Sequence, residues 1–433
     1  MKADRHNRHA VQSHTVAWLD SKKNARLLLI VLVSVFCLIG IFLVAHANGT
    51  ASTTWMEIYS PCDFGSIANL LAYLRDLRVP IPPMISTAEI VNCLLAGNVD
   101  FMTQTLYRVV LVAVYVLAMV FASSSPHKLL PSFLLSVVFL WSTVIVHPGN
   151  PQTYDIYFPL FVLLYILLLK FTCSGDYSEG LRVLFAVGSG FFLSMAELCR
   201  VFIFILIPIL LFCTYLALKN LPRKYLWCFL IPVVVFTGGW HANLLLRHGQ
   251  LVSSNHSGFN LIRAWPMVQM PALQPEPDDA PLKPGRWKNL NTAEHYENSR
   301  RVQHAVLQYI LEHPTESIRH GFDRISSVLV DVPTSIYSYK PEHAIFLFYR
   351  PAVWISSVIL FASLLWLIVS LARAKGHRWQ SVFAAPEHIL IILTVLSIIL
   401  LSIGESGEEA RFLISVLPLL AALPTYQNNS SAR

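Results

Sequence analysis

Four short clusters of polar residues, each next to a long apolar run, hold the side chains of this chain that are suited to chemistry. They are residues 57–65, 147–155, 197–200 and 405–411. Carboxylates in these clusters can accept a proton from a hydroxyl group, and the arginines can pair with a phosphate group. The clusters are therefore candidates for proton transfer and for binding of a phosphorylated substrate.

Each candidate side chain also has a structural interpretation that needs no reaction. Asp63 and Asp155 precede apolar helical runs, where an aspartate often serves as the N-cap. Glu197 and Arg200 are close enough along the chain to pair with each other across a turn. Arg411 opens an apolar run, and a long basic side chain there can extend to the membrane surface. Both interpretations stay open for every one of these residues.

The elements that would position these clusters are membrane-spanning helices. Of the 433 residues, 55% are hydrophobic and only 13% are charged, whereas soluble domains carry about 25% charged residues. Apolar runs of about 17–25 residues recur along the chain, which is the length needed to cross a bilayer core. We expect an all-α polytopic bundle of about ten such helices, near residues 27–45, 106–122, 129–147, 156–172, 182–198, 201–218, 225–243, 346–372, 387–404 and 410–425.

The basic residues predict the orientation of this bundle. Lys and Arg are concentrated in the tail 1–26 and in alternate loops, around Lys128, Arg182, residues 219–224 and residues 373–378. Such loops face the cytoplasm in most membrane proteins, so both termini are predicted to be cytoplasmic and all four polar clusters to lie on the outer side. The net charge of +7 forms no continuous basic stripe, so we expect no nucleic-acid partner.

Two predicted outer segments are long enough to carry structure. The first, residues 46–105, shows two apolar helical stripes separated by prolines and should form interfacial helices on the membrane surface. The second, residues 242–344, begins with a polar stretch around His256 and Arg263. We interpret it as an ordinary loop, with contact to an acceptor substrate as the alternative. A Pro-rich part, residues 265–287, follows. Helices are then predicted from Asn291 to His313 and over the stripe from Ile318 to Leu329.

This organisation predicts the following divisions of the chain: a cytoplasmic tail (1–26), membrane helices that include the first outer loop (27–241), an extracytoplasmic region (242–344), C-terminal membrane helices (345–425) and a second cytoplasmic tail (426–433). Cys62 and Cys93 lie in the same predicted outer loop. They are candidates for a disulfide if that side of the membrane is oxidising.

Several of these features resemble the polytopic glycosyltransferases of the GT-C type. Asp63-Phe64 precedes the helical stripe Ile67–Leu77 in the first outer loop, Asp155 lies in a short outer turn before the fourth span, and Arg411-Phe412 is followed by apolar residues and Pro418. The resemblance implies a GT-C-like fold and transfer of a sugar from a polyprenyl-phosphate donor to an acceptor hydroxyl. A carboxylate would act as general base and the anomeric carbon would be inverted.

The resemblance also implies roles for individual residues. Asp63 and Asp155 would be catalytic, and the substrate- or phosphate-binding residues would be Arg411, Arg200, Glu57 and His147. The acceptor would be a lipid, a glycan or a protein. No Asp-x-Asp pair lies near Asp155, so no metal ligand is assigned, and a divalent cation is left open as a cofactor.

Two other functions remain as alternatives to an enzyme. The first is a transporter or flippase for a lipid or a polyprenol-linked glycan, which would be expected to show paired halves and broken helices near mid-membrane. The second is a non-catalytic membrane subunit that binds lipid or a partner. The short loops favour a multi-pass protein of a bacterial inner membrane.

Overall fold

The computed structural model describes residues 110, 113–115, 154–199, 202–248, 257–268, 293–330, 345–374 and 379–404. Within these ranges the regular structure is helical, with no strand. The helices are α6 (Tyr154–Cys173), α7 (Glu179–Cys199), α8 (Ile203–Leu218), α9 (Arg223–Val233), the π-helix η4 (Val234–Gly238), α10 (Gly239–His248), α11 (Ser257–Ala264), α13 (Ala293–Glu312), α14 (Pro314–Val330), α16 (Ile345–Arg373), α17 (Trp379–Ala384) and α18 (Pro386–Gly404).

Helices occupy each of the predicted spans that fall in the described ranges. Four helical segments are long and apolar enough to cross a membrane: Glu179–Cys199, Arg223–Leu246, Val353–Arg373 and Pro386–Gly404. α6 and α8 contain shorter apolar stretches, Tyr157–Cys173 and Ile203–Leu218. These segments support the prediction of a helical membrane protein. The predicted spans 27–45, 129–147 and 410–425, and most of 106–122, lie outside the described residues.

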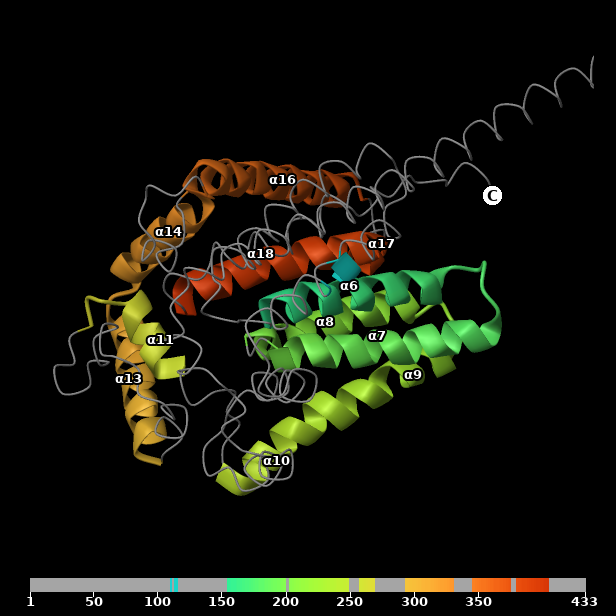
Figure 1. Ribbon diagram of the computed structural model, residues 1–433, viewed down its shortest axis with the longest axis horizontal. Coiled ribbons are helices and arrows are strands. Elements are labelled where there is room, and N and C mark those ends of the chain that lie inside the picture. The colour runs from blue at the N-terminus through green and yellow to red at the C-terminus, as the bar shows by residue number, and fades with distance from the viewer. Residues whose placement is uncertain are drawn as a thin grey trace, which may run out of the picture.

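The centre of the bundle is formed by α7 packed between α6 and α9 (Figure 1). Small residues of α7 allow this close approach. The Ser189 hydroxyl donates to the Tyr165 carbonyl of α6 at 3.1 Å. A Cβ added at Gly190 would lie 2.0 Å from the Phe229 carbonyl oxygen of α9. Aromatic and aliphatic side chains fill the remaining space, and the largest fully buried ones include Phe158, Leu163, Tyr165, Ile166 and Phe229.

One end of the bundle, which we call the basic end, collects the lysines and arginines of the loops. The Lys170 ammonium lies 3.4 Å from the Glu387 carboxylate, and the Arg182 Nε–H donates to the Thr172 carbonyl at 2.9 Å. Lys219 contacts Gln380, and Lys224 contacts Glu179. All these contacts join helix ends that the sequence assigns to the same side of the membrane. The structure therefore groups them together, while the compartment they face stays a prediction.

The opposite end, which we call the far end, is covered by α11, α13 and α14 (Figure 1). Ile262, Ala264 and Trp265 of the α11 segment pack against Val302 and Val306 of α13. The indole N–H of Trp265 donates to the Ile403 carbonyl at the end of α18 at 2.8 Å. These contacts attach α11 and α13 to the bundle.

α13 and α14 confirm the two helices predicted in the second outer segment, but the interpretation of residues around Arg263 as an ordinary loop was wrong. They form α11, in which a Cβ at Gly258 would lie 1.7 Å from the Ser299 carbonyl oxygen of α13. A helix of 8 residues is too short to be stable alone, so its stability comes from contacts with α13, α14 and α18. The first outer segment, residues 46–105, and Cys62 and Cys93 within it lie outside the described residues.

Candidate functional site: a buried glutamate–histidine pair

A buried carboxylate lies at the far end of the bundle. Glu197 belongs to the last turn of α7, and only 2% of its surface is exposed. An ionisable group surrounded by apolar helices is costly unless it is paired, and in membrane proteins such groups usually serve a function. The partners of Glu197 therefore determine what this end of the bundle can do.

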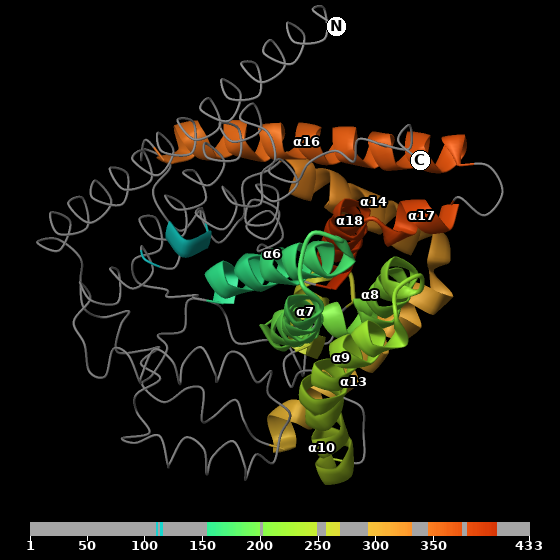
Figure 2. The ribbon, with the colours of Figure 1, turned by 90° about the vertical axis from the view of Figure 1, so that its right-hand side faces the viewer.

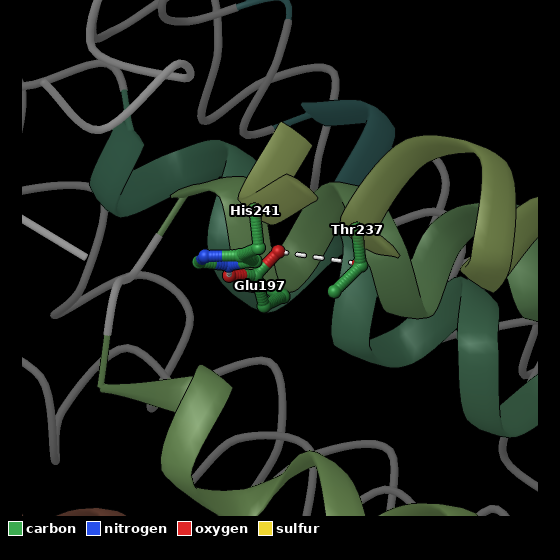
Figure 3. Close-up of polar contacts among 3 residues, drawn as sticks. All are labelled: Glu197, Thr237 and His241. Carbon is green, nitrogen blue, oxygen red and sulfur yellow. Dashed lines mark hydrogen bonds and ion pairs between the residues drawn. The ribbon is translucent and has the colours of Figure 1, made fainter. Parts of the chain in front are cut away.

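Both oxygens of the Glu197 carboxylate are engaged by residues of the neighbouring helix (Figure 3). Oε1 lies 2.8 Å from Nε2 of His241, and Oε2 accepts a hydrogen bond of 3.2 Å from the Thr237 hydroxyl. Since an ionised carboxylate can only accept, we assign the proton between the first two groups to Nε2 of His241. The carboxylate then holds the imidazole in one tautomer and one orientation.

The local fold explains why both partners reach Glu197. Thr237 belongs to the π-helix η4 and His241 to α10, which continues the same helical segment. The two residues are one turn apart, so they share a face of this helix. A π turn inside an α-helix adds a residue to the turn and is frequent at functional sites. Here it lies two residues after Pro232, which removes a backbone N–H from the helix.

The ring of His241 lies in a closely packed environment. His241 is 5% exposed, and its ring centroid lies 3.9 Å from that of Phe204 of α8. Its Nδ1 is buried and has no hydrogen-bond partner among the residues that the structure describes. With the carboxylate on Nε2, Nδ1 is the ring atom through which a proton would be exchanged with a further group.

A second ionisable cluster lies at the basic end. His388 of α18 is buried, its Nδ1 lies 2.5 Å from the Val382 carbonyl, and its ring centroid is 4.3 Å from that of Trp366. The adjacent Glu387 pairs with Lys170, whose side chain is 36% exposed. This cluster joins α6, α16 and α18 close to the helix ends, and we interpret it as a structural junction.

The structure places few of the site residues that were predicted from the sequence. Asp155 lies in the first turn of α6, whose opposite end is at the basic end, so its backbone is at the same far end as Glu197. Its side chain lies outside the described part of the chain. Five further candidates are also outside it, namely Asp63, Arg411, Arg200, Glu57 and His147. Their roles stay predictions.

Sequence reasoning had placed Glu197 in a polar cluster but missed its two partners. A usable signal existed for His241, because it is an ionisable residue within the predicted span 225–243. No sequence signal pointed to Thr237, since threonine is common in membrane helices. The alternative pairing of Glu197 with Arg200 involves a residue outside the described ranges, but both Glu197 oxygens already have partners.

The described residues include no group of three or more His, Cys, Asp or Glu side chains arranged to hold a metal ion. Comparisons of the chain with protein families, with curated proteins and with solved structures found no match.

Proposed function

We propose that this protein is an integral membrane glycosyltransferase that moves a sugar from a polyprenyl-phosphate donor to an acceptor hydroxyl on the extracytoplasmic face. The observation that carries the proposal is the buried pair of Glu197 and His241 at the far end of the bundle. A carboxylate–imidazole pair near the end of membrane helices suits proton transfer to or from a substrate that is itself anchored in the lipid.

In the proposed reaction a base removes the proton of the acceptor hydroxyl while the oxygen attacks the anomeric carbon. The bond between that carbon and the phosphate oxygen breaks, and polyprenyl phosphate leaves as an anion. Asp63 is the base that the GT-C resemblance suggests, and Arg200 or Arg411 would pair with the leaving phosphate. Glu197 and His241 would hold or pass on a proton beside this site.

A second candidate function is a transporter or flippase for the same class of lipid-linked substrate. The π-helix η4 interrupts a helix that is long enough to span the membrane, and interrupted helices are frequent at transporter binding sites. Glu197, however, lies in the last turn of its helix, whereas transport sites usually lie near mid-membrane. This position favours the enzyme.

The experiment that tests the proposal compares two glutamates of the same helix. The purified full chain in lipid nanodiscs is incubated with polyprenyl-phosphate hexoses or pentoses and with candidate lipid, glycan and protein acceptors. Glu197→Gln is expected to lose most of the transfer while it inserts and folds normally. The matched control is Glu179→Gln, because the Glu179 side chain is 69% exposed at the basic end of α7, and it should retain activity.

The other outcomes are equally informative. Unchanged sugar transfer by Glu197→Gln would show that the buried pair takes no part in the reaction. Unchanged transfer by Asp63→Asn would show that Asp63 is not the general base. Movement of a lipid-linked sugar across the bilayer without any transfer to an acceptor would favour the transporter.

A further inference from the structure

α14 has its polar and apolar faces in an unusual arrangement. The face that packs against the protein contains Ser317, His320, Arg324 and Val328. The His320 Nε2–H donates to the Ala264 carbonyl of α11 at 2.7 Å, and the Arg324 Nε–H donates to the Ser402 carbonyl of α18 at 2.9 Å. Polar side chains therefore attach this helix to the rest of the protein.

The first half of the apolar stripe of α14 points away from these contacts. Ile318 is 62% exposed and Phe322 is 66% exposed. Further along the same stripe, Ile325 is half-buried and Leu329 packs against the cluster of Val328, Leu360 and Ile398. A surface helix of a soluble protein buries its apolar stripe and exposes its polar face. The exposed stripe of α14 is expected if its surroundings are lipid, since apolar surface left in water is unfavourable.

The C-terminal end of α14 contacts α16, which contains a candidate membrane span. The Ser357 hydroxyl of α16 donates to the Leu329 carbonyl at 2.7 Å, and the Trp354 indole N–H donates to the Val330 carbonyl at 3.3 Å. From this junction an exposed apolar stripe runs along the candidate membrane span of α16. Its residues are Trp354, Ile355, Val358, Phe361, Leu365 and Ile368.

The position of α16 makes lipid the natural neighbour of this stripe. α16 lies at the edge of the described helices, on the side away from α9 and α10 (Figure 2). Trp354, where the two helices meet, is a residue type that is enriched at the boundary between lipid and water. The exposed apolar surface of α16 thus begins at its junction with α14.

We propose that α14 is an interfacial helix whose Ile318–Phe322 face is immersed in the bilayer at the far end of the bundle. This face contacts membrane lipid at the boundary between headgroups and acyl chains. Amphipathic helices insert their apolar face about 5–10 Å into this boundary. Because α14 also holds α11 and α18 through His320 and Arg324, it sets the depth at which the α11–α13 cap lies over the membrane surface.

The test measures what surrounds position 322 in the full chain. A fluorescent amino acid is incorporated through an amber codon at position 322, at the exposed neighbouring position 323 as the matched control, and at position 361 of α16 as the lipid reference. The protein is placed in nanodiscs and quenched either with lipids brominated near the headgroup or with aqueous iodide. We expect bromolipid quenching to be several-fold stronger at position 322 than at position 323, and iodide quenching to show the reverse order.

Strong iodide quenching at position 322 would show that the stripe faces water, and quenching by neither agent would show that protein covers it. Either result would overturn the proposal. A second measurement places the probe at position 318 and compares Phe322→Asp with Phe322→Leu. The aspartate should raise iodide quenching at position 318 several-fold, because a charge cannot stay in the lipid, whereas leucine should leave it unchanged. Equal quenching in the two variants would also count against lipid contact.

Discussion

Replacement of His241 by phenylalanine is the perturbation for which the structure predicts the largest effect. Phenylalanine has a similar ring, so it can keep the contact with Phe204. It removes the Nε2–H that lies 2.8 Å from Oε1 of Glu197, which leaves that carboxylate with the 3.2 Å hydrogen bond from Thr237. The change therefore removes one of the two partners of a buried carboxylate without opening a large cavity.

The expected cost follows from the burial of the carboxylate. Glu197 is 2% exposed, so water cannot replace the lost donor unless the helices separate. Loss of a hydrogen bond to a charged group costs about 1.5–3 kcal/mol, and an unsatisfied buried group adds about 1–3 kcal/mol. We expect His241→Phe to lower the free energy of unfolding by about 3–5 kcal/mol, which is the range for breaking one partner of a buried pair.

The double variant separates pairing from simple loss of packing. Glu197→Leu alone leaves an unpaired imidazole N–H and should cost about 1–3 kcal/mol. Glu197→Leu combined with His241→Phe replaces the pair with two apolar side chains, which is often neutral or stabilising. The double variant should therefore be clearly more stable than His241→Phe alone, with a coupling well above the additivity error of about 0.5 kcal/mol.

The assay is SDS-induced unfolding of the full chain in detergent micelles, followed by helical circular dichroism, with transfer measured in parallel. Additive losses in the double variant would refute the assigned pairing, as would a His241→Phe variant as stable as the wild type. Under the proposed function the double variant should be folded but inactive. Full transfer by a folded double variant would show that the pair only supports the structure.

Two further predictions concern helix packing. Gly190→Ala should destabilise the bundle by about 1–3 kcal/mol, because its Cβ would lie 2.0 Å from the Phe229 carbonyl oxygen. The control Gly180→Ala, on the same helix, meets nothing within 4 Å and should not destabilise it. SDS-induced unfolding compares the two variants, and equal stability would contradict the close contact between α7 and α9. Trp265→Phe loses the hydrogen bond to the Ile403 carbonyl, which should lower the free energy of unfolding by about 1 kcal/mol. We expect faster hydrogen–deuterium exchange in α11. Unchanged exchange would show that this hydrogen bond does not hold α11 to α18.

Most helices of the described part of the chain can be predicted from the sequence alone. The spans were readable because a bilayer requires long apolar runs, and such runs are a local property of the chain. α13 and α14 can also be predicted from the sequence, because each has its own apolar stripe and His313-Pro314 separates the two segments. The sequence does not predict α11, because its helical conformation depends on the contact of Gly258 with Ser299 of α13. These two residues lie far apart along the chain.

The candidate site divides in the same way. A charged residue at the end of an apolar run is visible in the sequence, which places Glu197 in the polar cluster 197–200. Its partners depend on the packing of α7 against α9 and on a π turn that aims Thr237 and His241, 40 and 44 residues further along, at the same carboxylate. This pairing, like the choice of the α14 face that contacts the protein, follows from tertiary packing. Contacts between distant segments depend on the shapes of the packed helices, which local periodicity does not predict.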